Sequence, residues 1–215
     1  MEFLRLVNEK TRRAYNLAAQ KYHDLFRNEM TEKEYDRKLL DGFAAKFPKG
    51  TLLCDAGCGP SAHIGRYLYE KGLRVVGVDI SDRCVELARA YNPVMDIERM
   101  DMARPVFLAD SFDGILSYYS IIHTPKAFLG RIFGEFRRIL KPGGYLLVTV
   151  KAGTGEGYRN ELLDIATEIY MTLFSEEEIV RYFGRAGFQL EFIDKRNPYD
   201  FEIHNERIFA IGRKA

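Results

Sequence analysis

Residues 51–62, Thr51-Leu-Leu-Cys-Asp-Ala-Gly-Cys-Gly-Pro-Ser-Ala62, decide the fold of this chain. The segment begins with a short apolar run, which is typical of a buried strand, and continues directly into a glycine-rich turn. A helical pattern follows from Ala62 to Lys71. Glycines at such a turn let the backbone approach a ligand where a side chain would clash. The stretch therefore predicts a strand, a ligand-binding turn and a helix in succession.

The same alternation of strand and helix repeats along the middle of the chain. Ser81 is a suitable N-cap for a helix that runs through Ala90, and Thr124-Pro125 opens a helix that ends near Leu140. The strands predicted around these helices are residues 74–79, 94–100, 112–118 and 145–150. Strands that alternate with helices, several of them apolar on both faces, predict a parallel sheet covered by helices on both sides.

The two ends of the chain depart from this alternation. Residues 8–47 follow an amphipathic helical pattern, with a capping box at Thr31–Glu34 as the start of a second helix. After a glycine-rich loop at 153–157, the predicted elements are a short helix over 160–170, a helix over 179–186 behind a capping box at Ser175–Glu178, and strands over 188–195 and 207–213. The last two strands have only a loop between them, which predicts antiparallel neighbours.

The overall composition is that of an ordinary globular protein. The 215 residues include 32 Lys and Arg against 31 Asp and Glu, a net charge of +1. This balance argues against binding of long nucleic acids or anionic membranes by bulk electrostatics. Three cysteines are too few for a secreted disulfide framework, and no run approaches the roughly 20 apolar residues of a membrane span. We therefore expect a reduced, cytoplasmic protein, either a monomer or a homodimer, without a metal site.

The glycine turn also fits a nucleotide-binding fingerprint. Gly57-x-Gly59-x-x-Ala62 matches the dinucleotide pattern, and Asp79 follows about 20 residues later, at the end of the second predicted strand. An acidic residue at that place can accept hydrogen bonds from both hydroxyls of a ribose. The pattern predicts an adenosine-type ligand and, by itself, leaves open a nicotinamide-dependent oxidoreductase.

Two further acidic residues favour a different nucleoside. Asp55 precedes the first glycine by two positions, where a carboxylate would repel a pyrophosphate but can bind an ammonium group. Asp101-Met102 follows the third strand and offers an acceptor for an adenine amine beside an apolar side chain. These positions favour a cofactor that has an amino-acid portion.

In these motifs the sequence resembles the class I S-adenosylmethionine-dependent methyltransferases that modify small molecules. The matching segments lie in the expected order over residues 51–151: LLCDAGCGPSA, RVVGVDIS, MDM, FDGILSYYSIIH and RRILKPGGYLLVTV. Ser61 stands where the third glycine of the family loop is usual, and is expected to narrow the space beside the cofactor. The resemblance implies a Rossmann-like, doubly wound α/β fold with a mostly parallel seven-stranded sheet and an antiparallel C-terminal strand. It divides the chain into an N-terminal helical lid, residues 1–47, and a cofactor-binding domain, residues 48–215.

The resemblance also implies roles for individual residues. The cofactor S-adenosyl-L-methionine, and its product S-adenosyl-L-homocysteine, would contact Asp55, Gly57, Cys58, Gly59, Asp79, Ile80, Asp101, Met102, Ser117 and Tyr118. Tyr15, Ala19 and Tyr22 share one helical face. Their spacing is typical of a core stripe, but the family often carries the same Y-x-x-x-A-x-x-Y pattern in a helix that closes over the cofactor. We expect Tyr22 and Tyr15 to reach the cofactor or the methyl-transfer channel.

Candidate acceptor residues follow the fourth strand. His123 is the best-placed general base if the acceptor is a hydroxyl or a protonated amine; the alternative is a histidine bonded to backbone at a helix entry. Tyr119, Tyr158 and Tyr199 could line the acceptor pocket, or could serve only to pack loops. The fourth strand ends in SYYS rather than the NPPY-like stretch of enzymes that methylate nucleobases or glutamine amides, which favours a small-molecule acceptor. A protein that binds the cofactor without catalysis remains the third hypothesis.

Overall fold

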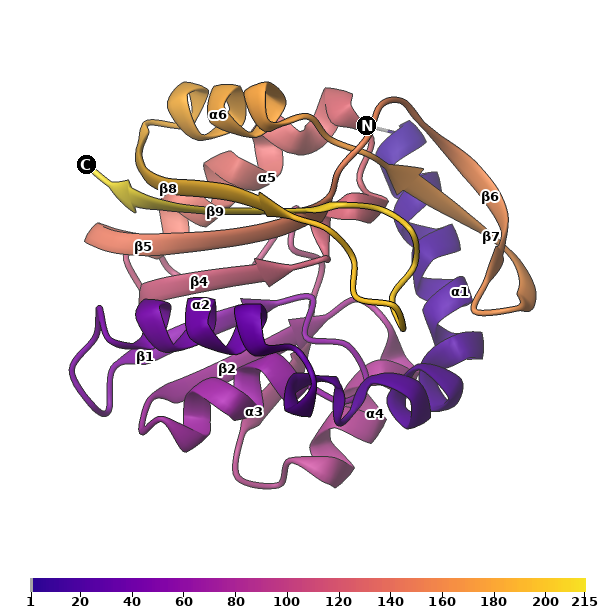
Figure 1. Cartoon of the computed structure of the whole chain (residues 1–215), viewed down its shortest axis with the longest axis horizontal. Helices are drawn as coiled ribbons and strands as arrows, with labels where there is room; N and C mark the ends of the chain where they lie inside the picture. Colours follow the sequence, from indigo (N-terminus) through magenta and orange to yellow (C-terminus); the bar gives the residue numbers. More distant parts are fainter. Residues whose placement is uncertain (1) are drawn as a thin grey trace.

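A seven-stranded sheet forms the centre of the structure, a computed structural model that describes residues 2–215 (Figure 1). The strand order is β3-β2-β1-β4-β5-β9-β8. The strands are β1 (Leu52–Ala56), β2 (Arg74–Asp79), β3 (Asp96–Arg99), β4 (Phe112–Tyr118), β5 (Leu140–Lys151), β8 (Phe188–Arg196) and β9 (Arg207–Lys214). The first five pair in parallel, and β9 is antiparallel to both β5 and β8. The predicted doubly wound sheet with an antiparallel C-terminal strand is confirmed.

Helices cover both faces of this sheet (Figure 1). One face carries α5 (Lys126–Ile139) and α6 (Glu176–Arg185), which bury Phe133, Phe136 and Phe183 against the sheet. The other face carries α2 (Glu34–Ala44), α3 (His63–Glu70) and α4 (Asp82–Tyr91). Two apolar layers on opposite faces explain why the central strands are apolar on both sides.

The first helix, α1 (Glu2–Phe26), lies across the carboxyl ends of the parallel strands (Figure 1). Polar side chains one turn apart fix it there: Asn8 donates to Asp101 at 2.8 Å and Arg12 pairs with Asp82 at 2.9 Å. In the following turn, the Asn16 amide oxygen accepts from the Ser81 hydroxyl at 2.7 Å. The two N-terminal helices therefore lie in different places. Helix α1 covers the carboxyl ends of the strands, whereas α2 packs Leu40 and Phe43 into the core on one face of the sheet.

The expectation of a helix over residues 160–170 is wrong. Strands β6 (Glu156–Leu162) and β7 (Ile165–Thr172) form an antiparallel hairpin that lies beside α1. Leu163 and Asp164 make its two-residue turn with φ values of +52° and +58°, the conformation of a type I′ turn. Ile169 and Tyr170 are buried, so a tertiary contact of the hairpin outweighs the local helical pattern.

The predicted capping box at Thr31 is also wrong. Thr31 ends a short 3₁₀ helix, η1 (Glu29–Thr31), and α2 begins at Glu34 behind Lys33. Lys33 is buried because its ammonium group pairs with Glu29 and Glu202, each at 2.7 Å, and this contact fixes the chain between the two helices. The capping box at Ser175 is confirmed at the start of α6.

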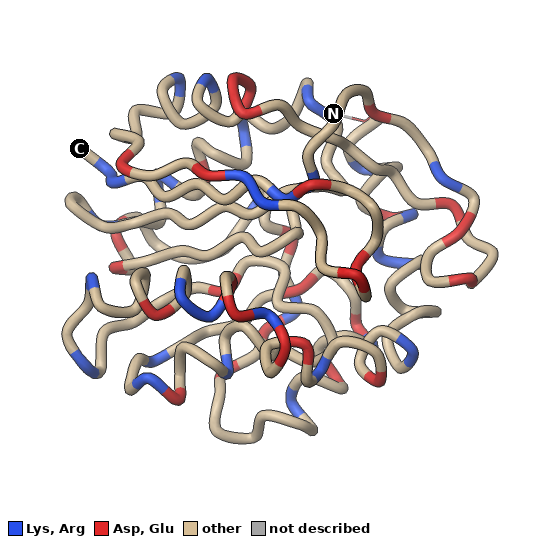
Figure 2. The backbone as a smooth tube through the Cα atoms, in the orientation of Figure 1, with Lys and Arg blue, Asp and Glu red and all other residues tan. Residues whose placement is uncertain are grey.

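Charge is mixed over the whole molecule. Figure 2 shows Lys and Arg interspersed with Asp and Glu along the backbone, with no extended region of one sign. Within residues 2–215, no helix combines the length and the apolar character that crossing a lipid bilayer requires.

Candidate active site

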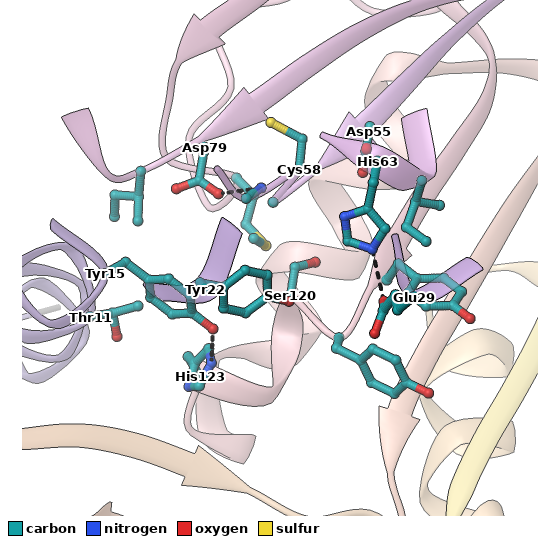
Figure 3. Close-up of a pocket in the computed structure, with 17 residues that line it drawn as sticks. Thr11, Tyr15, Tyr22, Glu29, Asp55, Cys58, His63, Asp79, Ser120 and His123 are labelled. Atoms are coloured by element: carbon teal, nitrogen blue, oxygen red, sulfur yellow. Dashed lines mark hydrogen bonds and ion pairs between the residues drawn. The ribbon is translucent and has the colours of Figure 1, made fainter. Parts of the chain in front are cut away.

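The carboxyl ends of the parallel strands, together with α1, enclose a small cavity of about 70 Å³ (Figure 3). Most of the residues that the sequence nominated for the cofactor meet there. The cavity is lined by Thr11, Tyr15, Tyr22, Glu29, Asp55, Gly57, Cys58, Gly59, His63, Ile64, Asp79, Ile80, Met102, Tyr118, Tyr119, Ser120 and His123. We refer to it as the first cavity.

The glycine turn forms part of its wall. Gly57 has a φ of +85° and Gly59 a φ of +66°, a left-handed region that favours glycine. A Cβ on Gly57 would lie 2.2 Å from the Cβ of Ser120, so the turn also has no room for a side chain. The amides of Gly57 and Cys58 both donate to the carbonyl of Val78, which ties the turn to β2. Cys58 is buried, which raises the pKa of its thiol well above the ordinary value and keeps it protonated.

Asp79 lies at the carboxyl end of β2, next to this turn. Its two carboxylate oxygens accept from the amides of Gly59 and Ser81, each at 2.9 Å. Burial raises the pKa of Asp79, and these backbone hydrogen bonds act in the opposite direction. Each oxygen keeps a further lone pair, so the carboxylate is positioned to accept hydrogen bonds from a ligand.

Asp55, near the end of β1, is more deeply buried than Asp79. It is 1% exposed, and its carboxylate accepts from the Gly65 amide at 3.1 Å. Burial raises the pKa of Asp55 to about 7, with the nearby charge of Asp79 adding to the effect. A buried carboxylate of this kind favours a cationic ligand group, because such a group would stabilise its charged form.

Tyr15 and His123 form a hydrogen-bonded pair on the opposite side (Figure 3). The Tyr15 hydroxyl lies 2.9 Å from His123 Nε2, and His123 Nδ1 lies 2.7 Å from the carbonyl oxygen of Tyr170. Since a carbonyl only accepts, Nδ1 carries the proton and Nε2 accepts from Tyr15. Burial lowers the pKa of His123 to about 4, so the ring is neutral at pH 7 and is a weak base.

Glu29 is a functional candidate that sequence reasoning missed, and it contacts His63, a weaker candidate for a base than His123. Glu29 comes from η1 and accepts from His63 Nε2 at 2.8 Å and from Lys33 at 2.7 Å. Burial acts to raise the pKa of Glu29, but the bonds with His63 and Lys33 outweigh it and leave the pKa below its ordinary value. The i, i+4 spacing of Glu29 and Lys33 was the only local signal, and it indicates a surface ion pair as readily as a site.

A second, larger cavity of about 500 Å³ adjoins the first. Its walls come from the end of α1, η1, the β6–β7 hairpin, the end of β5 and the loop between β8 and β9. Five residues line both cavities: Tyr15, Tyr22, Glu29, Tyr119 and His123. The second cavity is additionally lined by Leu25, Phe26, Asn28, Thr31, Glu32, Lys33, Ile122, Lys151, Leu162, Leu163, Met171, Phe201, Glu202, Ile203 and Arg207.

Four predicted site residues line neither cavity. Asp101 accepts from Asn8 and lies between α1 and the end of β3, in a separate surface depression that it shares with Ile80. Ser117 is buried and bonds to Ser120 at 2.7 Å. Tyr158 packs edge-on against Tyr170, with ring centroids 5.1 Å apart.

The fourth residue, Tyr199, accepts a hydrogen bond from the Tyr35 amide at 3.0 Å and stacks on Phe201. Ser61 also lines neither cavity, contrary to the expectation that it narrows the cofactor site. Its hydroxyl is bonded to His23 at 3.0 Å, on the far side of the loop.

Comparison with known proteins identifies the domain. Residues 54–148 match the family model of the methyltransferase domain. An S-adenosylmethionine-dependent methyltransferase of Methanosarcina mazei has the same fold, with a TM-score of 0.72 at 19% identity, over 80% of this chain and 96% of that one. Residues 54–148 are thus a methyltransferase domain, and the chain has the fold of the S-adenosylmethionine-dependent methyltransferases.

Two curated relatives show how diverse the relatives of this methyltransferase domain are. An S-adenosyl-L-methionine-dependent Diels-Alderase of Talaromyces variabilis is 37% identical over 55% of this chain and 42% of its own length. The 27-O-demethylrifamycin SV methyltransferase of Amycolatopsis mediterranei is 27% identical over 79% of this chain and 66% of its own. The chain thus spans less than two thirds of the length of either relative.

The methyltransferase family uses S-adenosylmethionine, and the site fits this cofactor. Three residues that line the first cavity carry a buried polar atom without a hydrogen-bond partner within residues 2–215: the hydroxyls of Thr11 and Tyr119, and Nδ1 of His63. Buried polar groups are normally bonded, so these atoms are available to a polar ligand. The match to a methyltransferase model argues against the nicotinamide interpretation of the glycine loop. The physical reason is Asp55, whose buried carboxylate suits an ammonium group and would repel a pyrophosphate.

Proposed function

We propose that this chain is an enzyme that transfers the methyl group of S-adenosylmethionine to a small-molecule acceptor. The observation that carries the proposal is the common boundary of the two cavities, formed by Tyr15, Tyr22, Glu29, Tyr119 and His123. A donor in the first cavity and an acceptor in the second would meet at this boundary. Methyl transfer needs little more than this geometry, because the reaction is an in-line displacement that depends on orientation.

The proposed cofactor contacts follow from the lining of the first cavity. Asp79 would accept from the ribose hydroxyls, and Ile80 and Met102 would pack against the adenine. Asp55 and Glu29 offer buried or partly buried carboxylates to the ammonium group of the methionine portion. Asp101 keeps lone pairs beside the hydrogen bond from Asn8, but it lies outside the first cavity and would serve the adenine amine only if a movement of α1 opened the space between them.

When bound, the cofactor supplies an electrophilic methyl group on a sulfonium ion. The task of the chain is to hold the acceptor in line and to exclude water. We propose α1 as the lid that does so. The first cavity, at about 70 Å³, is smaller than the roughly 300 Å³ at which small-molecule pockets begin, so α1 or its side chains must move before a cofactor can enter.

The Tyr15–His123 pair supports a positioning role at the boundary. Neutral His123 holds the Tyr15 hydroxyl through Nε2, and this hydroxyl lies where both cavities meet. A pKa near 4 leaves His123 able to take a proton only from an acceptor that becomes strongly acidic during transfer. An acceptor that needs no strong base therefore fits this site best.

The Diels-Alderase relative supports an alternative in which the cofactor is bound but its methyl group is not transferred. Calorimetry with S-adenosylhomocysteine, followed by incubation with methyl-labelled S-adenosylmethionine and a panel of metabolites below 1 kDa, separates the two. Methyl transfer predicts a labelled product, which is 14 mass units heavier than its precursor when the cofactor is unlabelled. Tight binding of S-adenosylhomocysteine with no labelled product across the panel would favour the alternative. Failure to bind S-adenosylhomocysteine would refute both.

A further inference from the structure

Two basic side chains, Lys151 and Arg207, are neighbours in the wall of the second cavity. Lys151 is the last residue of β5 and Arg207 the first of β9, and the two are direct partners in the antiparallel register. Side chains of directly opposite residues lie on the same face of a sheet, and like charges in that position are destabilising. Both residues line the cavity. An anion bound next to both side chains would offset the repulsion between their charges.

The nearest carboxylate is already occupied by other donors. Glu202 accepts from Lys33 at 2.7 Å, from Arg196 at 2.6 and 3.1 Å, and from the Tyr199 amide at 3.0 Å. Arg207 reaches Glu202 only at 3.8 Å, the longest of these contacts. Glu202 therefore neutralises Lys33 and Arg196 more than it neutralises the Lys151–Arg207 pair.

Lys151 itself has no partner. Within residues 2–215 its ammonium group makes no hydrogen bond and no ion pair. Burial lowers the pKa of Lys151 to about 8, and the nearby charge of Arg207 acts in the same direction. The side chain is thus still mainly protonated at pH 7, at a partly buried place where an unpaired charge is costly.

The other acidic residues of the cavity do not supply the missing anion. Glu29 is bonded to His63 and Lys33, and Glu32 lies exposed at the rim. Arg207 is 4% exposed, donates to the carbonyl of Asn205, and lies over the Tyr119 ring at 5.8 Å from its centroid. Its guanidinium group has five N–H donors, so it can still bind an oxyanion.

Most of the remaining lining surface of the second cavity is apolar. Three large apolar side chains of the lining are more than half exposed and together form an accessible apolar wall: Leu25 at 55%, Phe201 at 52% and Ile203 at 55%. Deeper in the cavity lie Phe26, Ile122, Leu162, Leu163 and Met171. A volume of about 500 Å³ lies within the range of pockets for drug-sized molecules.

We propose that the acceptor is an amphipathic molecule whose apolar body fills the second cavity and whose oxyanion, such as a carboxylate, binds Lys151 and Arg207. This inference rests on the proposed function, because it takes the occupant of the second cavity to be the methyl acceptor. The anionic end would lie in the wall of the cavity where β5 ends and β9 begins. The Tyr15–His123 pair would contact another part of the same molecule.

The test uses 1-pyrenebutyrate and its neutral amide as fluorescent probes of the charge preference. The wild type should bind the carboxylate about tenfold or more tightly than the amide. Lys151→Gln should reduce this preference to less than threefold and leave binding of the amide within about twofold. Lys151→Arg should keep the preference. Lys38→Gln, on the exposed face of α2, is the matched control and should behave as the wild type.

Equal binding of the two probes by the wild type, binding of neither, or an unchanged preference in Lys151→Gln would overturn the proposal. Thermal denaturation checks that the variants fold, and Lys151→Gln should melt no lower than the wild type because it removes a like-charge pair. Calorimetry with S-adenosylhomocysteine on the same samples keeps the two proposals apart. Loss of cofactor binding alone refutes the proposed methyl transfer, whereas the probe preference decides the anion site.

Discussion

The two cavities differ in how the chain builds them. The first is formed largely by short turns at the ends of β1, β2 and β4, each of which directly continues a buried strand. The second is assembled from α1, η1, the β6–β7 hairpin, the end of β5 and the β8–β9 loop, which are far apart in sequence. A site that always holds the same cofactor can be encoded in local turns, whereas a site that distinguishes acceptors can vary with the segments around the sheet.

The cavities differ equally in their polarity. The first is lined by the buried carboxylates of Asp55 and Asp79 and by three residues whose buried polar atoms have no hydrogen-bond partner among residues 2–215. The second is mainly apolar, with one cationic wall at Lys151 and Arg207. Substitutions in the first cavity should therefore change cofactor binding, and substitutions confined to the second should leave it intact.

The largest effect is expected from Gly57→Ala. The new Cβ would lie 2.2 Å from Ser120 Cβ, and a φ of +85° adds roughly 1–2 kcal/mol of backbone strain. We expect binding of S-adenosylhomocysteine to fall by at least a hundredfold in calorimetry. Gly155→Ala is the matched control, since Gly155 has a φ of +83° but nothing within 4 Å of its Cβ position. If both variants bind normally, the turn does not hold the cofactor.

Asp79→Ala should have the next largest effect. It removes a carboxylate that is held by two backbone amides at the edge of the first cavity. Loss of a charged hydrogen-bond acceptor costs about 1–3 kcal/mol, so the dissociation constant for S-adenosylhomocysteine should rise roughly 5- to 150-fold. Asp113→Ala, at the opposite end of β4, removes a partly exposed carboxylate paired with Lys141 and should not change this dissociation constant. Unchanged affinity in Asp79→Ala would refute the ribose contact.

Asp55→Asn should raise the stability of the protein above neutral pH and weaken its binding of the cofactor. The pKa of Asp55 is about 7 in the folded protein and about 4 in an unfolded chain, so between these values only the folded state binds the proton. The wild type should therefore lose stability as the pH rises from about 4 to 7. At pH 8 the variant should be about 1–3 kcal/mol more stable than the wild type, and at pH 4 nearly equal to it, in chemical denaturation.

The same variant should bind S-adenosylhomocysteine more weakly, because it lacks the carboxylate proposed for the ammonium group. Asp113→Asn, whose partly exposed carboxylate lies outside both cavities, is the control and should bind S-adenosylhomocysteine as the wild type does. If the Asp55→Asn variant is less stable than the wild type at pH 8, burial of the charged Asp55 carboxylate does not destabilise the folded protein, contrary to the prediction.

Local sequence signals account for the first cavity. Strands β2 and β4 have the bounds predicted for them, because β-branched and apolar runs are bounded by clear turn and capping residues. The glycine turn and Asp79 meet as expected, since the carboxyl ends of neighbouring parallel strands share one edge. Asp101 departs from its expected place because α1 binds it through Asn8, a contact between residues 93 positions apart.

The second cavity could not be predicted in the same way. Its hairpin turns at Leu163-Asp164, without the Asn or Gly that announces a type I′ turn, so packing of β7 against α1 decides the structure. The Lys151–Arg207 pair depends on the pairing and register of β5 with β9, whereas the sequence predicts only that the last two strands are antiparallel neighbours. The contact of Glu29 with His63 joins residues 34 positions apart, so no local sequence pattern indicates it.

The smallest effect on the cofactor is expected from Phe201→Ser. Phe201 lines only the second cavity and is 52% exposed, so its loss should change the stability by less than about 0.5 kcal/mol. Affinity for S-adenosylhomocysteine should stay within twofold, while affinity for the neutral 1-pyrenebutyramide should fall about fivefold because apolar contact area is lost. Phe192→Ser, on β8 and outside both cavities, is the control and should change neither. A Phe201→Ser variant that loses cofactor affinity would show that the two cavities act as one site, and the separation argued from their construction would then be wrong.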